Sequence, residues 1–176
     1  GCSPVLPAAA CTDGTTATVG DESCRPIADC GEARYPATTG PTIYVDATAV
    51  GGDGSEAAPF ASLAQAVAAA PAGATIAIAA GDYDEAITLG DTPLELAGRC
   101  PSMVRLHTSA DAAVSISGAA SITVRGMTLS GSGAGVEVVS GHALLRDLHL
   151  VDLGSFGVVA VTQGRDASVA IDNVRI

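Results

Sequence analysis

The chain has 176 residues and a formal net charge of −11, a length that suits about one domain. It contains 34 Ala and 21 Gly but only two Phe, three Tyr and no Trp, so the core must come from small and aliphatic side chains. All eight basic residues are Arg, which excludes Schiff-base chemistry and a GK[ST] phosphate-binding loop. Such an acidic chain is also unsuited to nucleic acids and to anionic membranes, because both carry dense negative charge.

Four of the five cysteines lie within the first 30 residues. Residues 1–40 are rich in Thr, Ser, Pro, Gly and Asp and show no hydrophobic period, so this arm buries too little to order itself without cross-links. None of the cysteines forms a CxxC pair, so no zinc site is predicted. The disulfide candidates are Cys11, Cys24, Cys30 and Cys100, which indicate an oxidising compartment outside the cytoplasm. Three pairings are open, and we favour Cys11 with Cys24 and Cys30 with Cys100.

The fifth cysteine, Cys2, has two open interpretations. Gly1-Cys2-Ser3 resembles the end of a bacterial lipobox, in which the cysteine is lipidated after the signal peptide is removed. Alternatively, Cys2 pairs with a cysteine upstream of this sequence. A lipid anchor is the only membrane attachment predicted, because no run approaches the roughly 18 to 20 apolar residues that span a bilayer.

After the arm, the pattern predicts one strand and one helix. Residues 42–46 alternate and favour β structure. Ser62 and Gln65 have the spacing of a capping box, and apolar residues recur at helical spacing over about 60–70, before Pro71. We expect this short helix to cover an apolar end of the strand array that follows.

Two segments could suggest calcium. The Gly-rich loop at residues 51–55 resembles a calcium-binding nonapeptide only weakly, because the motif occurs once. Asp82-Tyr83-Asp84-Glu85 is the densest acidic run, and we interpret it as a solvated turn, with a weak calcium site as the alternative. Apart from that alternative, no cofactor is predicted.

The main signal is an internal repeat of apolar-polar-apolar triplets. The triplets start at Val104, Met127, Leu148 and Val174, with steps of 23, 21 and 26 residues. The flanking residues repeat too, and Gly, Ser and Asp fill the corners. The flanking segments at residues 122–126, 143–147 and 169–173 align with one another, and a second set of strands falls between them at residues 136–138 and 158–160.

These repeats are too short to bury their apolar faces alone, and no helix-length segment connects them. Coiling the chain so that each repeat stacks on the previous one, about 4.8 Å away, buries Val, Ile and Leu in continuous columns. We therefore predict an all-β fold, a parallel β-helix over residues 41–176, preceded by the Cys-rich arm of residues 1–40.

Several motifs resemble a known family. Residues 43–46, 53–55, 59–67 and 79–83 resemble the opening of right-handed parallel β-helix proteins of the pectate-lyase-like superfamily. More narrowly, Leu94-Glu95-Leu96-Ala97-Gly98-Arg99-Cys100-Pro101 and the arm resemble secreted or lipid-anchored β-helix proteins of the myxobacterial kind. The likeness spans roughly residues 42–176. It implies a right-handed coil.

The superfamily contains polysaccharide lyases and hydrolases, which need clustered carboxylates. Here the outward positions form one column of Arg105, Thr128, His149 and Arg175 and another of Arg125, Arg146 and Asp172. No three acids fall on successive turns, so no catalytic or metal-binding residue is predicted. The candidate ligand surface is the set Arg105, Arg125, Arg146, His149 and Arg175.

The leading hypothesis is a non-enzymatic secreted or cell-surface bacterial protein that offers an interaction surface to a polysaccharide or surface protein. The alternative is a polysaccharide lyase or hydrolase, or a glycan-binding protein, with its site on coils outside this sequence. Residues 169–176 read as the apolar centre of a strand set, so we expect the natural chain to continue past Ile176 and to be a monomer when complete.

Overall fold

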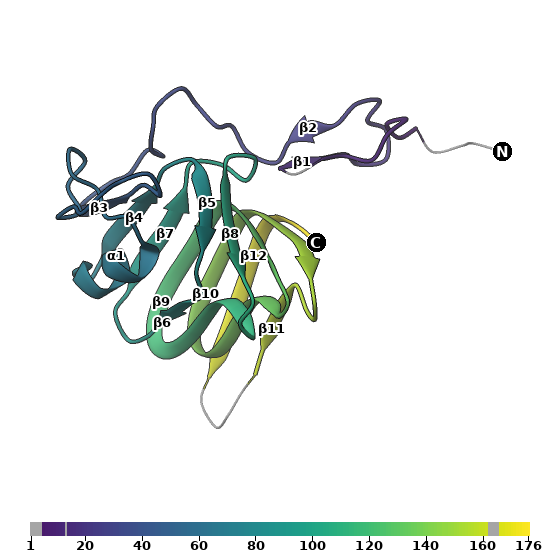
Figure 1. The fold of residues 1–176 in the computed structure, drawn as a ribbon. Helices are drawn as coiled ribbons and strands as arrows, with labels where there is room; N and C mark the ends of the chain where they lie inside the picture. The colour runs from purple at the N-terminus through teal and green to yellow at the C-terminus, as the bar shows by residue number, and fades with distance from the viewer. Residues whose placement is uncertain (1–4, 13, 162–165) are drawn as a thin grey trace.

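A computed structural model describes residues 5–12, 14–161 and 166–176, so Cys2 lies outside the described residues (Figure 1). The described residues form one short helix and a succession of mostly parallel strands. Their bounds in chain order are β1 Thr15–Thr16, β2 Arg25–Pro26, β3 Thr42–Val45, α1 Leu63–Ala69, β4 Ala74–Ile78, β5 Gly81–Asp84, β6 Ile87–Leu89, β7 Leu94–Gly98, β8 Val104–Thr108, β9 Ala112–Gly131, β10 Ala134–Leu153, β11 Val158–Ala160 and β12 Ala167–Arg175.

The strands from β3 onward stack in parallel on three faces of a β-solenoid of about four turns. The first face joins β3, β4 and β7 to the middle of β9, the middle of β10 and the start of β12. The second face joins β5 and β8 to the ends of β9, β10 and β12. The third face joins β6 to the starts of β9 and β10 and to β11. The predicted parallel β-solenoid is confirmed.

The stacking register is the one that the repeat predicted. On the second face, Arg105 pairs with Thr128, Thr128 with His149, and His149 with Arg175. On the first face, Leu145 lies between Val124 and Ile171 of the neighbouring turns. A step of 21 to 26 residues therefore returns the chain to the same place on the solenoid.

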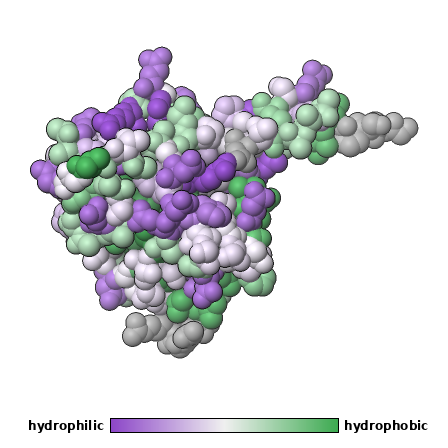
Figure 2. Space-filling model, in the orientation of Figure 1, coloured by the Kyte–Doolittle hydropathy of each residue, from purple (hydrophilic) through white to green (hydrophobic). Residues whose placement is uncertain are grey.

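The core consists of inward-facing aliphatic columns. Leu96, Val124 and Leu145 are fully buried on the first face, and Leu106 and Leu129 are buried on the second. Among the described residues, the last turn of the solenoid has a neighbouring turn on one side only. Large apolar side chains are exposed there. Figure 2 shows hydrophobic surface gathered over these last turns, at the lower right of the view.

One corner of the solenoid needs a left-handed backbone. Gly126, Asp147 and Asn173 each separate a first-face strand segment from a second-face segment and have φ values of 70°, 50° and 52°. Gly, Asn and Asp are the residues that adopt this conformation most readily. The stacked corners also approach closely, because a Cβ on Gly126 would lie 2.4 Å from the carbonyl oxygen of Gly98.

Helix α1 packs at the N-terminal end of the solenoid, beside β3 and β6 (Figure 1). The Ser62 side chain accepts a hydrogen bond from the Gln65 amide, as the capping-box spacing predicted, and Leu63 and Ala66 join the core. The helix starts at Leu63 rather than near residue 60, because Phe60 pairs with the free edge of β3. The Phe60 amide donates to Tyr44 O at 2.9 Å.

The arm runs beside the solenoid and is fixed by two disulfides, Cys11–Cys24 and Cys30–Cys100, the pairing favoured above. Among its described residues, the only regular structure is the two-residue antiparallel pair β1–β2, which lies to the right of the solenoid in Figure 1. Disulfides of this kind indicate an extracellular or otherwise oxidising environment. Of the helices in the described part of the chain, none is long and apolar enough to cross a membrane.

We predict that Leu145→Ala lowers the free energy of unfolding by about 2–5 kcal/mol, because it opens a cavity between stacked side chains. The neighbouring Leu144 points outward and is partly exposed, so Leu144→Ala should cost less than about 1 kcal/mol. Urea unfolding followed by circular dichroism measures both variants. Equal losses would contradict the inward and outward assignment.

A second prediction concerns the corner. Gly126→Ala should destabilise the protein by about 1–3 kcal/mol, because the new Cβ needs a positive φ and meets the Gly98 carbonyl. Asp147→Gly is the matched control at the equivalent corner, where relief of the positive φ offsets the lost side-chain hydrogen bond to Asn173. The midpoint of thermal unfolding should be clearly lower for Gly126→Ala than for Asp147→Gly. Equal midpoints would refute the requirement for a left-handed backbone at this corner.

Candidate functional site

The predicted ligand-surface residues fall in two columns on two adjoining faces. Arg105, His149 and Arg175 share the outward column of the second face. Arg125 and Arg146 are direct neighbours on the first face. The corner at Gly126, Asp147 and Asn173 separates the columns, so the five residues flank one edge of the solenoid.

The first-face arginines are engaged with carboxylates. Arg125 Nε donates to Glu95 Oε1 of the preceding turn, and Arg146 Nε donates to Asp172 Oδ2 of the following turn at 3.0 Å. The Arg125–Glu95 pair is partly buried, whereas the Arg146–Asp172 pair is largely exposed. An exposed ion pair of the second kind contributes little to stability.

The arm lies against the second-face column. Arg175 Nη1 donates to the carbonyl oxygen of Thr15 at 2.7 Å, and the Gly14 amide donates to His149 Nδ1 at 3.1 Å. His149 is only 6% exposed as a result. This contact fixes the His149 tautomer, because an accepting Nδ1 carries no proton.

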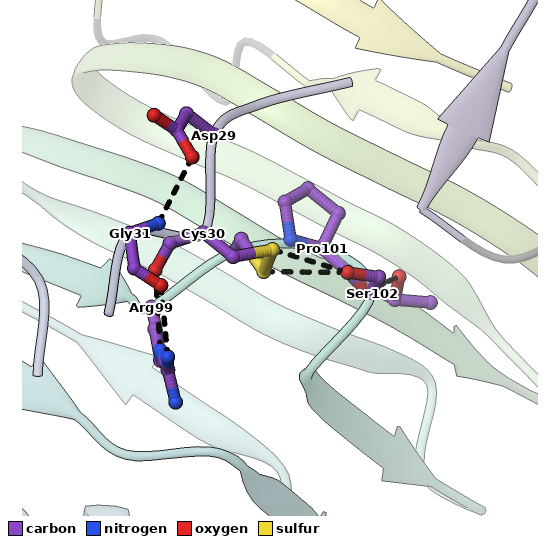
Figure 3. The surroundings of a disulfide bond; sticks show 8 residues. Asp29, Cys30, Gly31, Arg99, Pro101 and Ser102 are labelled. Atoms are coloured by element: carbon purple, nitrogen blue, oxygen red, sulfur yellow. Dashed lines mark hydrogen bonds between the residues drawn. A yellow bond between two sulfur atoms is a disulfide. The ribbon is translucent and has the colours of Figure 1, made fainter. Parts of the chain in front are cut away.

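The arm is tied again at the Cys30–Cys100 disulfide, which Figure 3 shows. Arg99 reaches past the disulfide and donates to the carbonyl oxygens of Cys30 and Gly31, at 3.2 and 2.9 Å. The Ser102 hydroxyl lies 3.3 Å from each sulfur. Beside this tie, Arg99 and Arg125 line a depression of about 350 Å³ between the arm and the solenoid.

Tyr35 packs the arm against the first face. Its ring contacts Ala77 and Ala79, which point outward, and lies edge-on to Tyr44 with 4.8 Å between ring centroids. Arg34 lies over the same ring, 5.2 Å from its centroid. Burial raises the pKa of Tyr35, whose hydroxyl is buried without a hydrogen-bond partner among the described residues.

Asp46 joins the arm to the end of β3. Its carboxylate accepts from Arg34 Nη2 at 2.6 Å and from the amide and hydroxyl of Thr48 at 2.8 and 2.6 Å. Burial acts to raise the pKa of Asp46, but the hydrogen bonds from Thr48 and Arg34 outweigh it, so the pKa is below its usual value. Asp46 thus stays ionised and holds Arg34 beside Tyr35.

The acidic run at residues 82–85 differs from the predicted turn. Residues 81–84 form strand β5, because the buried Tyr83 side chain points inward and its hydroxyl donates to Ala79 O at 3.0 Å. Glu85 accepts the amide protons of Leu63 and Ala64 at 2.9 and 3.0 Å, and so caps α1. Within the described ranges, no three His, Cys, Asp or Glu side chains gather at metal-binding distance.

Two further depressions flank His142 on the first face, with volumes of about 400 and 420 Å³. His142 Nδ1 lies 2.6 Å from the Ser168 hydroxyl of the next turn. The His107–Ser130 pair on the second face has the same ladder arrangement at 3.2 Å. The recurrence indicates that stacking in register produces such pairs.

Several residues at the edge that holds the arm were not predicted from the sequence as part of this surface. Asp82 pairs in register with Arg105, and the 23-residue step between them, equal to that from Arg105 to Thr128, could have revealed it. Asn173 Nδ2 donates to the carbonyl oxygen of Ile27 at 2.7 Å. Contacts of this kind have no sequence signal, because the acceptor is backbone.

Among known protein families, residues 49–99 match one described as "Protein of unknown function (DUF1565)", which is typically β-helical. The match covers the loop after β3, helix α1 and strands β4 to β7. No curated protein and no solved structure matches the chain.

We predict that Tyr35→Phe raises the free energy of unfolding by about 1 kcal/mol, because it removes a buried hydroxyl that lacks a partner. Tyr44→Phe, at the other ring of the pair, should change it by less than about 0.5 kcal/mol. Urea titrations at equal protein concentration compare the two. A destabilised Tyr35→Phe protein would mean that the hydroxyl is bonded.

Proposed function

We propose that this chain is a secreted or cell-surface bacterial β-solenoid that acts by binding a partner on its outer faces. The observation that carries the proposal is the open ladder of the third face. Thr88, Ser115, Glu137 and Val159 align outward on four successive turns and are exposed or partly exposed. Figure 1 draws this face, with β6 and β11, on the side away from the arm.

A rigid ladder of this kind suits binding because its side chains are held at the strand spacing before a partner arrives. Pre-ordered groups lose little conformational entropy on association. Thr88 and Ser115 offer hydroxyl groups, Glu137 accepts from the Ser115 hydroxyl at 3.2 Å, and Val159 adds an apolar position. A polysaccharide or an extended surface protein could bind such a mixed ladder.

Binding is favoured over glycan cleavage because three of the outward carboxylates are paired with arginines. Asp172, Glu95 and Asp46 each contact an arginine. A glycoside hydrolase needs two carboxyl groups about 5–9.5 Å apart, one of them protonated. Carboxylates bound to guanidinium groups are poorly suited to that protonated role.

The cellular placement and the finer fold assignment belong to the same proposal. The two disulfides support secretion, and lipidation of Cys2 would hold the protein at a membrane surface. The solenoid is proposed to be right-handed and pectate-lyase-like, with α1 as the cap, and the match of residues 49–99 to a typically β-helical family supports its β-helical part. The Leu63 and Ala66 side chains, buried against the first turn, fit that capping role.

The test is a pair of outward substitutions at the two ends of the third-face ladder. Thr88→Arg with Val159→Arg should lower binding of the labelled protein to cells of its source organism at least tenfold. Val50→Arg is the matched control, because Val50 is 96% exposed and lies in a loop away from the ladder. Flow cytometry measures the bound protein.

The same preparations are assayed for reducing ends and unsaturated products on acidic polysaccharides, where no turnover is expected. Equal binding by the double variant and the control would refute a third-face surface. Turnover that is lost on substitution of an outward Arg or Asp would instead identify an enzyme.

A further inference from the structure

The solenoid holds the arm by its backbone. Four solenoid side chains, Arg99, Arg125, Asn173 and Arg175, donate hydrogen bonds to arm carbonyl oxygens. We call these four residues, together with His149 and the Ala77–Ala79 patch under Tyr35, the arm-binding surface. The acceptor carbonyls belong to Thr15, Ile27, Cys30, Gly31 and Ala37.

The arm itself behaves as a bound peptide. The pair β1–β2 is the only regular structure in the part of the arm that the structure describes, and residues 27–41 have no strand or helix of their own. This irregular segment is held through carbonyl oxygens and one aromatic anchor, Tyr35, contacts that an extended segment of another chain could also make. The arm-binding surface therefore has the features of a peptide receptor with a resident occupant.

Charge favours one kind of occupant. Arg99, Arg105, Arg125 and Arg175, half of all arginines in the chain, lie along this edge of the solenoid although the formal net charge is −11. Two acids lie among them, because Glu95 pairs with Arg125 and Asp82 stands beside Arg105, so Arg99 and Arg175 contribute most of the uncompensated positive charge. A local cluster of guanidinium groups attracts carbonyl and carboxylate oxygens. An acidic extended peptide fits this cluster better than a basic one.

The Cys30–Cys100 disulfide keeps the arm in place. A covalent tie in the middle of the bound segment gives the arm a high effective concentration, against which a free peptide competes poorly. Without that tie, the arm would be held by its hydrogen bonds, by Tyr35 and by the Arg34–Asp46 ion pair.

We infer that the arm-binding surface is a receptor for an extended acidic peptide segment, and that the Cys30–Cys100 disulfide closes it by tying down the arm. Opening needs a dithiol, which gives two electrons and two protons to the disulfide. The dithiol becomes a disulfide, and Cys30 and Cys100 become thiols. This inference does not depend on what binds the third face.

The experiment uses the full chain with Cys30→Ser, Cys100→Ser and Tyr35→Ala, so that its own arm is untied and lacks the anchor. The probe is a fluorescent peptide with the sequence of residues 26–40 and Ser at position 30. Fluorescence anisotropy should show at least tenfold tighter binding to this variant than to a matched Cys11→Ser, Cys24→Ser, Tyr35→Ala variant, which keeps the Cys30–Cys100 tie.

Two further comparisons test the chemistry. Arg99→Gln added to the untied variant should weaken peptide binding at least tenfold, whereas Arg146→Gln, which pairs with Asp172 away from the arm, should not. A peptide carrying Tyr35→Ala should bind at least tenfold more weakly. Equal binding to the tied and untied variants, no binding to either, or displacement by polygalacturonate rather than by the unlabelled peptide would overturn the inference.

Folding of the variants is checked by far-ultraviolet circular dichroism. If Cys100→Ser prevents folding, hydrogen exchange of the unaltered protein after dithiol treatment replaces the titration. Amides of residues 26–40 should then lose protection at least tenfold while those of β7 and β9 keep theirs. Unchanged protection of the arm would overturn the role of the disulfide.

Discussion

The structure depends on the in-register stacking of aliphatic side chains inside the coil. Each turn contributes residues such as Leu96, Val124 and Leu145 to a continuous buried column, and no turn could bury them alone. Because strand side chains alternate, a shift of one residue would turn a whole column outward. The same constraint sets the outward ladders, since residues between buried ones must face solvent or the arm.

The arm illustrates the opposite situation, a segment without a core of its own. It gains order from the solenoid through Tyr35 on the Ala77–Ala79 patch, from side-chain donors such as Arg99, and from the Cys30–Cys100 disulfide. Ordering an irregular segment costs conformational entropy, and a cross-link lowers that cost by restricting the unfolded chain. Some of the outward arginines that were predicted to form a ligand surface hold the arm instead.

Much of the fold could be predicted from the repeat. The triplets at Val104, Met127, Leu148 and Val174 lie on one face, and the aligned corner residues share a left-handed backbone. The start of α1 was harder to predict from the sequence, because Phe60 fits the helical spacing of apolar residues but pairs with the edge of β3 in the structure. The acidic run at residues 82–85 was misread as a turn, since its strand character depends on Tyr83 pointing inward.

The solenoid, its register and its corners follow from the amino-acid sequence. Periodic burial and left-handed corners leave a mark at fixed steps along the chain, because each turn repeats the same physical requirement. The contacts of the outward residues, in contrast, become visible once the chain is folded. Arg99, Asn173 and Arg175 contact carbonyl oxygens of the arm. Because every residue carries a carbonyl oxygen, no pattern of side chains in the sequence could predict these contacts.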